Sequence, residues 1–282
     1  MWTWTPESRR WYAEAAAMSG YHAALAAAMA PWLSPSWDVA DMGCGLGFLS
    51  LAVAPLVRSV TALDTDRDVL ESLAARASEA SAGNVRPKLC DVLSGNFHGR
   101  FDAVICSFFG RPGRDAADFL SHAGRVLAVV RRHSSPSIAP GADHRGGEDD
   151  ASVREALSAS GIPFSARDMD IEFGQPFADR DEAMAFLAHY DRGRRTPEER
   201  SARLDRELVS RPDGSLYLPH TKKISLIVYP VPAGSSPELP PDAGLKEGRQ
   251  EPFRRCLLCF TLFPFPCVLP LPFLPQCLPM PQ

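Results

Sequence analysis

The sequence has no excess of positive charge. Its 282 residues include 30 lysines and arginines against 34 aspartates and glutamates, which gives a formal net charge of -4 at pH 7. Proteins that bind a polyanion usually carry a basic field, so this balance disfavours DNA or RNA as a partner. We therefore expect no nucleic-acid partner.

Long uninterrupted apolar segments are also scarce. The apolar C-terminal run from Cys256 to Gln282 is punctuated by prolines, which break helical hydrogen bonding, so we expect no membrane-spanning helix and no membrane partner. Its single Cys-x-x-Cys pair lacks a second pair or histidines and cannot complete a tetrahedral zinc site. We expect no metal site, and we predict that residues 231–282 form a disordered tail.

The cysteines show no disulfide pattern. Three of them precede the tail: Cys44, Cys90 and Cys106. They lie in apolar, strand-like runs, where free cysteine behaves as a small buried hydrophobe typical of a reducing compartment. Arginines at positions 9 and 10 ahead of an alanine-rich run resemble an export signal, but Glu14 and His22 interrupt that run. We therefore predict a cytoplasmic protein.

The most informative stretch is an apolar run that ends in an acid and opens into three glycines at alternate positions. It reads Val39-Ala40-Asp41-Met42-Gly43-Cys44-Gly45-Leu46-Gly47. This order predicts a strand, a tight turn and the start of a helix. Glycine is needed where φ is positive or where a ligand approaches the backbone, so we expect a ligand against this turn. The first N–H groups of the helix would suit an anionic or carboxylate group.

Two cofactor classes use such a turn. A dinucleotide site requires G-x-G-x-x-G, which would place its third glycine where this sequence has Phe48. Asp41 at the strand end would repel a pyrophosphate but could pair with a cation. The stretch resembles motif I of the class I S-adenosylmethionine (SAM) methyltransferases. The resemblance implies that the turn holds the methionine part of SAM and that Asp41 lies near its amino group.

Two further acids follow expected strands. Asp64 ends the strand expected at 58–63, where it is placed to accept both hydroxyls of a ribose. Capping of the next helix is the alternative, although Thr65 and Asp66 are better placed for that role. Asp91 follows the third strand, where members of the family commonly meet the adenine amino group, and a solvent-facing turn acid is the alternative there.

The fourth expected strand, at 101–106, is nearly all apolar, as a strand buried on both faces should be. It ends in Ser107-Phe108-Phe109-Gly110, the position of the family's motif IV beside the transferable methyl group. Methyltransferases of base amines or glutamine amides typically have Asp or Asn, two prolines and an aromatic residue there. This tetrad departs from that pattern, which argues against base or glutamine N-methylation and leaves the acceptor atom open.

The alternation of strands and helices predicts an α/β fold, a doubly wound, mostly parallel sheet of seven strands with an antiparallel last strand. The last three strands are expected at 124–130, 164–173 and 223–229, with a mobile loop at 131–147. We expect three parts of the chain: an N-terminal helical lid at 1–36, a SAM-binding domain at 37–230 with a cap insertion at 174–221 between strands six and seven, and the tail.

The lid is predicted as one amphipathic helix at about residues 6–32, favoured by its alanines and ended by proline. Its aromatic residues either face substrate or pack on the core. The cap is longer than a hairpin requires, so we expect it to be functional and to order on substrate binding. Its exit brings Tyr217 and His220 together with two lysines, which predicts acid/base groups, with an exposed polar turn as the alternative.

These features predict a SAM-dependent methyltransferase that transfers a methyl group to a small-molecule acceptor by in-line displacement. The alternatives are a methyltransferase of protein or RNA, a non-catalytic SAM-binding module and, less favoured, an NAD-dependent oxidoreductase. The expected cofactor contacts are Asp41, Gly43, Cys44, Gly45, Gly47, Asp64, Thr65, Asp91, Val92 and Ser107. The expected substrate contacts are Tyr21, Phe108 and Phe109, and the expected catalytic groups are Tyr217 and His220.

Overall fold

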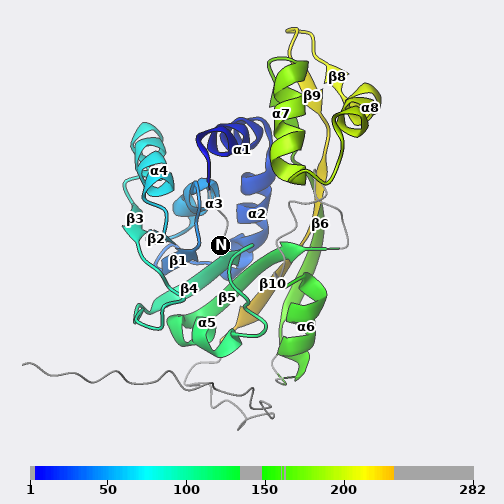
Figure 1. Cartoon of the computed structure of the whole chain (residues 1–282). Coiled ribbons are helices and arrows are strands. Elements are labelled where there is room, and N and C mark those ends of the chain that lie inside the picture. Colours follow the sequence, from blue (N-terminus) through cyan, green and yellow to red (C-terminus); the bar gives the residue numbers. More distant parts are fainter. Residues whose placement is uncertain (1–3, 134–147, 160, 162, 232–282) are drawn as a thin grey trace, which may run out of the picture. The chain divides into compact units, whose positions relative to one another are not determined.

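A seven-stranded sheet organises the chain in the computed structural model, which describes residues 4–133, 148–159, 161 and 163–231 (Figure 1). The strand order is β3-β2-β1-β4-β5-β10-β6. Its strands are β1 (Asp38–Met42), β2 (Ser59–Asp64), β3 (Val85–Leu89), β4 (Phe101–Ser107), β5 (Ala123–Arg132), β6 (Ser165–Glu172) and β10 (Thr221–Pro230). β10 runs antiparallel to both of its neighbours, whereas β1 to β5 pair in parallel. The predicted fold class is confirmed.

Helices cover both faces of this sheet. One face carries α1 (Pro6–Met18), α2 (Tyr21–Met29), α3 (Phe48–Val53) and α4 (Arg67–Glu79), and the other carries α5 (Ala116–His122) and α6 (Asp150–Ala159). Leu25, Leu49 and Leu73 join one apolar cluster with the sheet, and Phe119 and Val153 join the other. The central strands are therefore buried on both sides, which explains their continuous apolar runs.

The N-terminal segment is two helices rather than the single helix expected at 6–32. Ser19, the C-cap of α1, is extended with φ -95° and ψ 149°, and Gly20 precedes α2. Glycine and serine are poor interior helix residues, so the chain breaks here. A short 3₁₀ turn, Ala30–Trp32, follows α2. The break turns Tyr21 inward, where it is 2% exposed.

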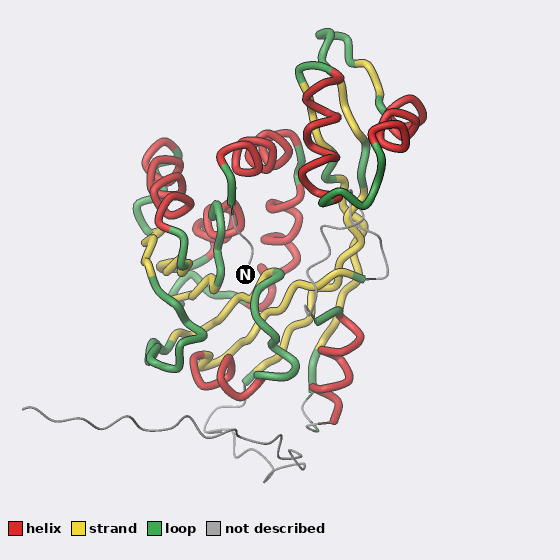
Figure 2. The backbone as a smooth tube through the Cα atoms, viewed as in Figure 1, coloured by secondary structure: helices red, strands yellow, loops and turns green. Residues whose placement is uncertain are grey.

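The insertion between β6 and β10 is a folded unit (Figure 2). It consists of β7 (Gln175–Phe177), α7 (Arg180–Asp191), α8 (Pro197–Glu207), β8 (Val209–Ser210) and β9 (Leu216–Leu218), with a small sheet in the order β7-β9-β8. Phe177, Phe186 and Leu204 build its own apolar cluster, to which α1 contributes Trp11. That the insertion orders on substrate binding stays a prediction.

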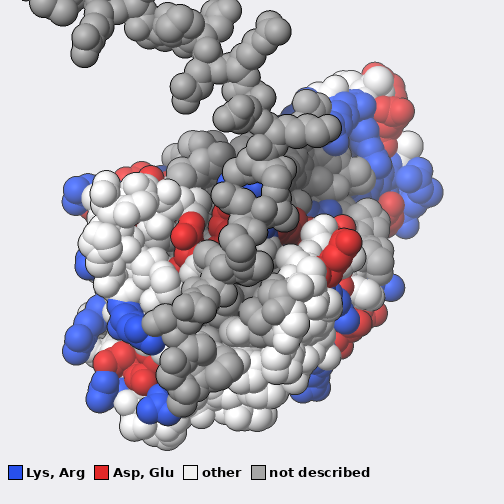
Figure 3. Space-filling view, turned by 90° about the horizontal axis from the view of Figure 1, so that it is seen from below, with Lys and Arg blue, Asp and Glu red and all other residues white. Residues whose placement is uncertain are grey.

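Other differences concern the ends of elements. β5 continues through Arg131 and Arg132, which we had expected in a loop. The rest of that expected loop, residues 134–147, and all but the first residue of the expected tail lie outside the described residues. No described helix is long and apolar enough to cross a membrane. On the face drawn in Figure 3, the described acidic and basic side chains are intermingled around a large uncharged area.

Candidate functional site

The glycine turn joins β1 to α3 at the carboxyl edge of the sheet. Gly43, Gly45 and Gly47 have φ of +69°, +51° and +73°, which L side chains rarely adopt. The N–H groups of Gly43 and Cys44 donate to the Leu63 carbonyl of β2 at 2.8 and 3.0 Å. The sequence therefore folds here into a left-handed turn that is fastened to the neighbouring strand.

The three glycines have different surroundings. A Cβ added at Gly43 would lie 2.0 Å from the ring of Phe109, and one at Gly47 would lie 2.3 Å from the side chain of Leu73. At Gly45 the nearest atom would be in the Trp4 ring at 3.4 Å, an ordinary contact. Two of the glycines thus make room for the protein's own side chains. Of the three, Gly45 has the least crowded surroundings, so we place a ligand on its side of the turn.

Asp64 ends β2 directly beside this turn. Its Oδ2 accepts a hydrogen bond from the N–H of Gly45 at 2.8 Å, and its Oδ1 accepts one from Asp66 at 3.0 Å. Asp66 is the N-cap of α4, as its side chain accepts from Asp68 and Val69, whereas Thr65 is exposed and does not cap. Each carboxylate oxygen of Asp64 keeps a further lone pair, so the group can accept two more donors.

Asp41 lies beneath the turn and is 2% exposed. The hydroxyl of Ser50 on α3 donates to its Oδ2 at 2.6 Å. Burial, together with the nearby charge of Asp64, raises the pKa of Asp41 to about 6. A buried carboxylate with a single hydrogen-bond donor favours a nearby cation, because the cation offsets the cost of burying the negative charge.

Replacing Asp41 by Asn is expected to stabilise the ligand-free protein at neutral pH. The folded pKa of about 6 exceeds the unfolded value of 3.8, so wild-type stability is fully present below pH 3.8 and is lost as the pH rises to about 6. The difference between the folded and unfolded pKa values corresponds to about 3 kcal/mol. Chemical denaturation from acid to neutral pH should show the gain of Asp41→Asn growing over this window. A gain that does not vary with pH would contradict the assignment.

Asp38 on the same strand offers a control of opposite sign. The hydrogen bonds from Arg58 and Ser59 lower the pKa of Asp38 to about 2. Its contribution to stability is therefore present above pH 3.8 and is lost as the pH falls to about 2. Asp38→Asn should lose stability at neutral pH, where Asp41→Asn gains it.

The motif IV segment follows β4, which ends at Ser107. Phe108 is 43% exposed and has φ +53°, and its N–H donates to the Val130 carbonyl at 3.0 Å. Phe109 packs between Gly43 and the ring of Phe119. The backbone thus presents Phe108 outward and uses Phe109 to join the glycine turn to α5.

Arg131 on β5 holds this segment in place, a role that sequence reasoning missed because it placed the residue in a loop. Its guanidinium is buried and donates to the carbonyls of Phe109 and Gly110 at 2.6 and 3.1 Å. It also donates to the carbonyls of Cys106 and Val130. Burial lowers the pKa of this arginine, which remains a cation.

Asp91 and Val92 follow β3. Asp91 is exposed and its Oδ1 accepts the N–H of Leu93 at 3.0 Å, so its carboxylate closes a turn. Val92 lines a hollow of about 590 Å³ with Met42 and Phe119. Its lining comes from the end of β1, the loop between β3 and β4, the segment after β4, and α5. The hollow therefore adjoins the motif IV segment on the α5 side of the sheet.

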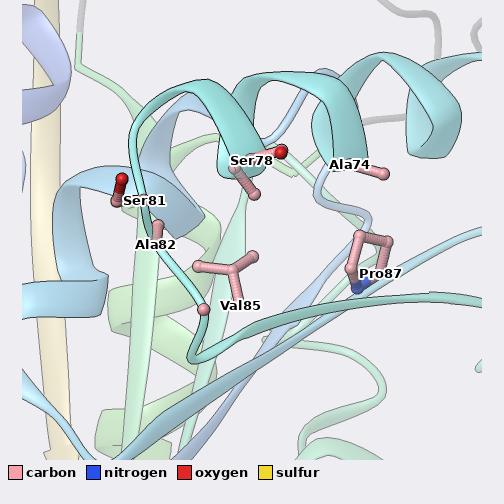
Figure 4. A pocket seen from close by; sticks show the side chains of 8 residues that line it. Ala74, Ser78, Ser81, Ala82, Val85 and Pro87 are labelled. Atoms are coloured by element: carbon pink, nitrogen blue, oxygen red, sulfur yellow. The ribbon is translucent and has the colours of Figure 1, made fainter.

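A separate hollow of about 320 Å³ lies between α4 and β3 (Figure 4). Its lining consists of small or apolar residues, Ala74, Ala77, Ser78, Ser81, Ala82, Gly83, Val85 and Pro87. It contains no titratable side chain, and Val85 marks the amino end of β3. We therefore do not assign chemistry to it.

The predicted catalytic pair lies in and beside the insertion. Tyr217 is on β9 with its hydroxyl packed against Gly174. His220 lies between β9 and β10, and burial, followed by the charges of Lys222 and Arg203, lowers its pKa to about 4. Among the described residues, no hydrogen bond or ion pair connects either side chain to the glycine turn. Their acid/base role stays a prediction.

A half-buried lysine, Lys222 on β10, lies in an aromatic cluster. The Lys222 ammonium is 3.6 Å from the ring centre of Phe173 and 4.6 Å from that of Tyr21. Beside them, the Tyr12 hydroxyl and His22 Nε2 are 3.0 Å apart. Tyr21, which we expected to touch substrate, has its ring in the core. Sequence reasoning named Lys222 only as one of two cations in a turn.

The thiol of Cys44 is a poor candidate for chemistry. Burial, with the nearby charges of Asp41 and Asp64, raises its pKa well above its usual range. The Cys44 side chain packs against the apolar core, and its backbone N–H donates to the Leu63 carbonyl.

Comparison with known proteins gives one family. Residues 39–129 match the family model described as a methyltransferase domain. This segment runs from β1 to β5 and includes the glycine turn, Asp64 and motif IV. No curated protein matches the sequence.

Distant solved structures resemble the fold. They include the YcgJ protein of Bacillus subtilis (16% identity, 74% of this chain and 97% of that chain covered, TM-score 0.49). A second is a SAM-bound magnesium protoporphyrin IX methyltransferase of Synechocystis PCC 6803 (18% identity, 74% of this chain and 79% of that chain covered, TM-score 0.43). A third is an rRNA methylase of Streptococcus thermophilus (14% identity, 74% of this chain and 95% of that chain covered, TM-score 0.42). These similarities are too distant to bear on the acceptor, and the fold assignment rests on the strand order itself.

Proposed function

We propose that this protein is a SAM-dependent enzyme that methylates a small organic acceptor, since residues 39–129 match the family model of a methyltransferase domain. The observation that carries the proposal is the meeting of the glycine turn, Asp64 and motif IV at one edge of the sheet. Ligands of open α/β sheets bind at this edge, outside the carboxyl ends of the strands.

The residues present fit the cofactor. The nearest atoms to a Cβ at Gly45 belong to the Trp4 ring at 3.4–3.9 Å, so a ligand on that side of the turn would displace this ring and no core side chain. The buried carboxylate of Asp41 suits the amino cation, directly or through water. Asp64 has lone pairs for both ribose hydroxyls, and Val92 lines a hollow that suits an adenine. SAM bound there supplies an electrophilic methyl group.

The chain's own contribution is to position the reacting groups. Arg131 fixes the backbone of Phe109 and Gly110 through their carbonyls, and Phe108 projects from that fixed segment. Holding an acceptor atom in line with the methyl group converts an encounter in solution into a unimolecular step, which is the main source of rate in such a reaction. A base is required only if the acceptor must lose a proton.

Two observations favour a small acceptor over RNA or protein. The net charge is -4, which provides no overall basic field for a polyanion. The insertion packs through its apolar cluster against Trp11 of the N-terminal helices, where it would help to enclose an acceptor. Enclosed, largely apolar sites are typical for small ligands.

The test is methyl transfer from methyl-labelled SAM into a cell extract, followed by identification of the labelled product. We expect the label in the small-molecule fraction. Label mainly in RNA or protein would support the alternative acceptors, and absence of transfer despite SAM binding would support a non-catalytic module. Calorimetric titration with SAM, S-adenosylhomocysteine and NADH separates the oxidoreductase alternative, which requires binding of NADH.

Shortening the insertion is expected to reduce methyl transfer while SAM binding persists. The variant joins Phe177 to Leu216 by a Gly-Ser linker and carries Trp11→Ser, because Trp11 is 3% exposed and would lose its cover. If the insertion binds acceptor, transfer should fall about 10-fold or more while SAM affinity stays within about 3-fold. Trp11→Ser in the full chain is the control. A folded, shortened protein with full turnover would refute this role.

A further inference from the structure

Lys222 has an unusual environment for a lysine near the start of a strand. Its ammonium lies over the Phe173 ring at 3.6 Å and within 4.6 and 5.5 Å of the ring centres of Tyr21 and Tyr12. The neighbouring Lys223 is exposed and pairs with Asp170 at 3.8 Å. Successive side chains of a strand point to opposite faces, so β10 sends one lysine outward and the other into the aromatic rings.

The ammonium of Lys222 has no hydrogen-bond acceptor and no carboxylate partner among the described residues. The hydroxyl of Tyr21, a residue that is 2% exposed, also has no hydrogen-bond partner there. Aromatic rings attract the cation but accept none of its three N–H groups in the manner of an oxygen. Buried polar groups in native proteins nearly always have partners. A buried hydroxyl without a partner, on a side chain whose ring adjoins an ammonium without a carboxylate, therefore suits an anionic ligand.

The other titratable groups near Lys222 do not supply the missing charge. His22 and His220 are neutral near pH 7, because burial, followed by the charge of Lys222, lowers their pKa to about 3 and about 4. Tyr12 is neutral as well, because burial raises the pKa of its hydroxyl. Burial also lowers the pKa of Lys222 itself to about 7. An anion in contact would restore the charged form.

This cluster adjoins the glycine turn. Phe48, the residue after Gly47, stacks on His22 at 5.4 Å between ring centres and lies 6.0 Å from Tyr12. Tyr12 in turn contacts Trp4, which covers Gly45. Tyr12, Phe48 and Lys222 are each half-buried, so the cluster can be reached from outside. A group held here would lie beside the proposed cofactor.

We propose that Lys222 binds a carboxylate of the methyl acceptor, with the half-buried ring of Tyr12 against the acceptor's apolar body. The proposal rests on the proposed function and names its substrate class, an apolar or aromatic carboxylic acid. A single lysine with one tyrosine hydroxyl matches one negative charge and two oxygens. A phosphate would leave more charge and more oxygens without partners.

The test compares benzoate with benzamide, which have nearly the same shape and differ in charge. Both are titrated by calorimetry into the full chain saturated with S-adenosylhomocysteine. The variants are Lys222→Met, which keeps the length of the side chain without its charge, and Lys223→Met as the matched control. Lys222→Met should fold, because it replaces an unpaired cation by an apolar side chain.

The wild type should bind benzoate about 10-fold more tightly than benzamide, and Lys222→Met should abolish this preference while Lys223→Met retains it. Because burial lowers the pKa of the Lys222 ammonium to about 7, benzoate should bind more tightly at about pH 6 than at about pH 8 in the wild type and in Lys223→Met, but not in Lys222→Met. Equal binding of the two probes by the wild type, or an unchanged preference in Lys222→Met, overturns the proposal. Failure of S-adenosylhomocysteine to bind would instead overturn the proposed function.

Discussion

Gly45→Val is expected to lose SAM binding and keep its fold. The added side chain has room in the free protein, because the nearest atom to its Cβ belongs to Trp4 at 3.4 Å. It would, however, fill the one side of the turn that is open to a ligand. We expect the dissociation constant to rise about 100-fold or more, which corresponds to about 3 kcal/mol. Calorimetry gives the affinity, and circular dichroism reports whether the variant is folded.

Gly47→Val provides the contrast. Its Cβ would lie 2.3 Å from the Leu73 side chain inside the core, so this variant should lose stability itself. Both positions have positive φ, so valine adds a backbone strain of about 1–2 kcal/mol at each. The difference in stability between the two variants therefore reports the clash of the valine side chain with Leu73. A folded Gly45→Val protein with unchanged SAM affinity would refute the placement of the cofactor on this turn.

Asp64→Ala is expected to weaken SAM binding by about 2–4 kcal/mol, or about 30- to 1000-fold, through loss of two charge-assisted hydrogen bonds to the ribose. The same change removes the acceptor that fixes the Gly45 N–H, so the turn itself becomes less ordered. Calorimetric titration with SAM measures the loss.

The control for Asp64→Ala is Asp66→Ala, two residues further on. Asp66 caps α4, so its loss should cost about 1 kcal/mol of stability with little effect on affinity. Asp64→Asn keeps the shape and one acceptor oxygen, and should be intermediate. An affinity change well below about 1 kcal/mol in Asp64→Ala would make Asp64 only a residue that orders the turn.

Sequence reasoning found the elements of the sheet because each central strand is an apolar run that ends in a polar residue. Asp64 and Ser107 end their strands, Asp41 is the penultimate residue of β1, and parallel strands bring such ends to one edge. The purpose of the glycines was only partly predictable. Their spacing indicates a left-handed turn, but that Phe109 packs on Gly43 depends on a contact 66 residues away in the chain.

The roles that sequence reasoning missed depend on the register of the strands and on the direction in which each side chain points. Whether Lys222 or Lys223 points toward the aromatic cluster follows from the pairing of β10 with β6, and a shift of one residue would exchange the two. Arg131 was assigned to a loop because the strand's apolar run ends at Val130. The guanidinium of Arg131 donates to backbone carbonyls, and no sequence pattern predicts such contacts.

The position of Trp4 links the N-terminus to the speed of cofactor exchange. Its indole lies against Gly45 and packs edge-on to Tyr12 at 5.5 Å, so it covers the side of the turn that a ligand would use. A cofactor that binds or leaves on that side has to displace this ring. The residence time of the cofactor then depends on how strongly the indole packs against its neighbours. Residues fused ahead of Trp4 would therefore alter on- and off-rates without touching any group that contacts the cofactor.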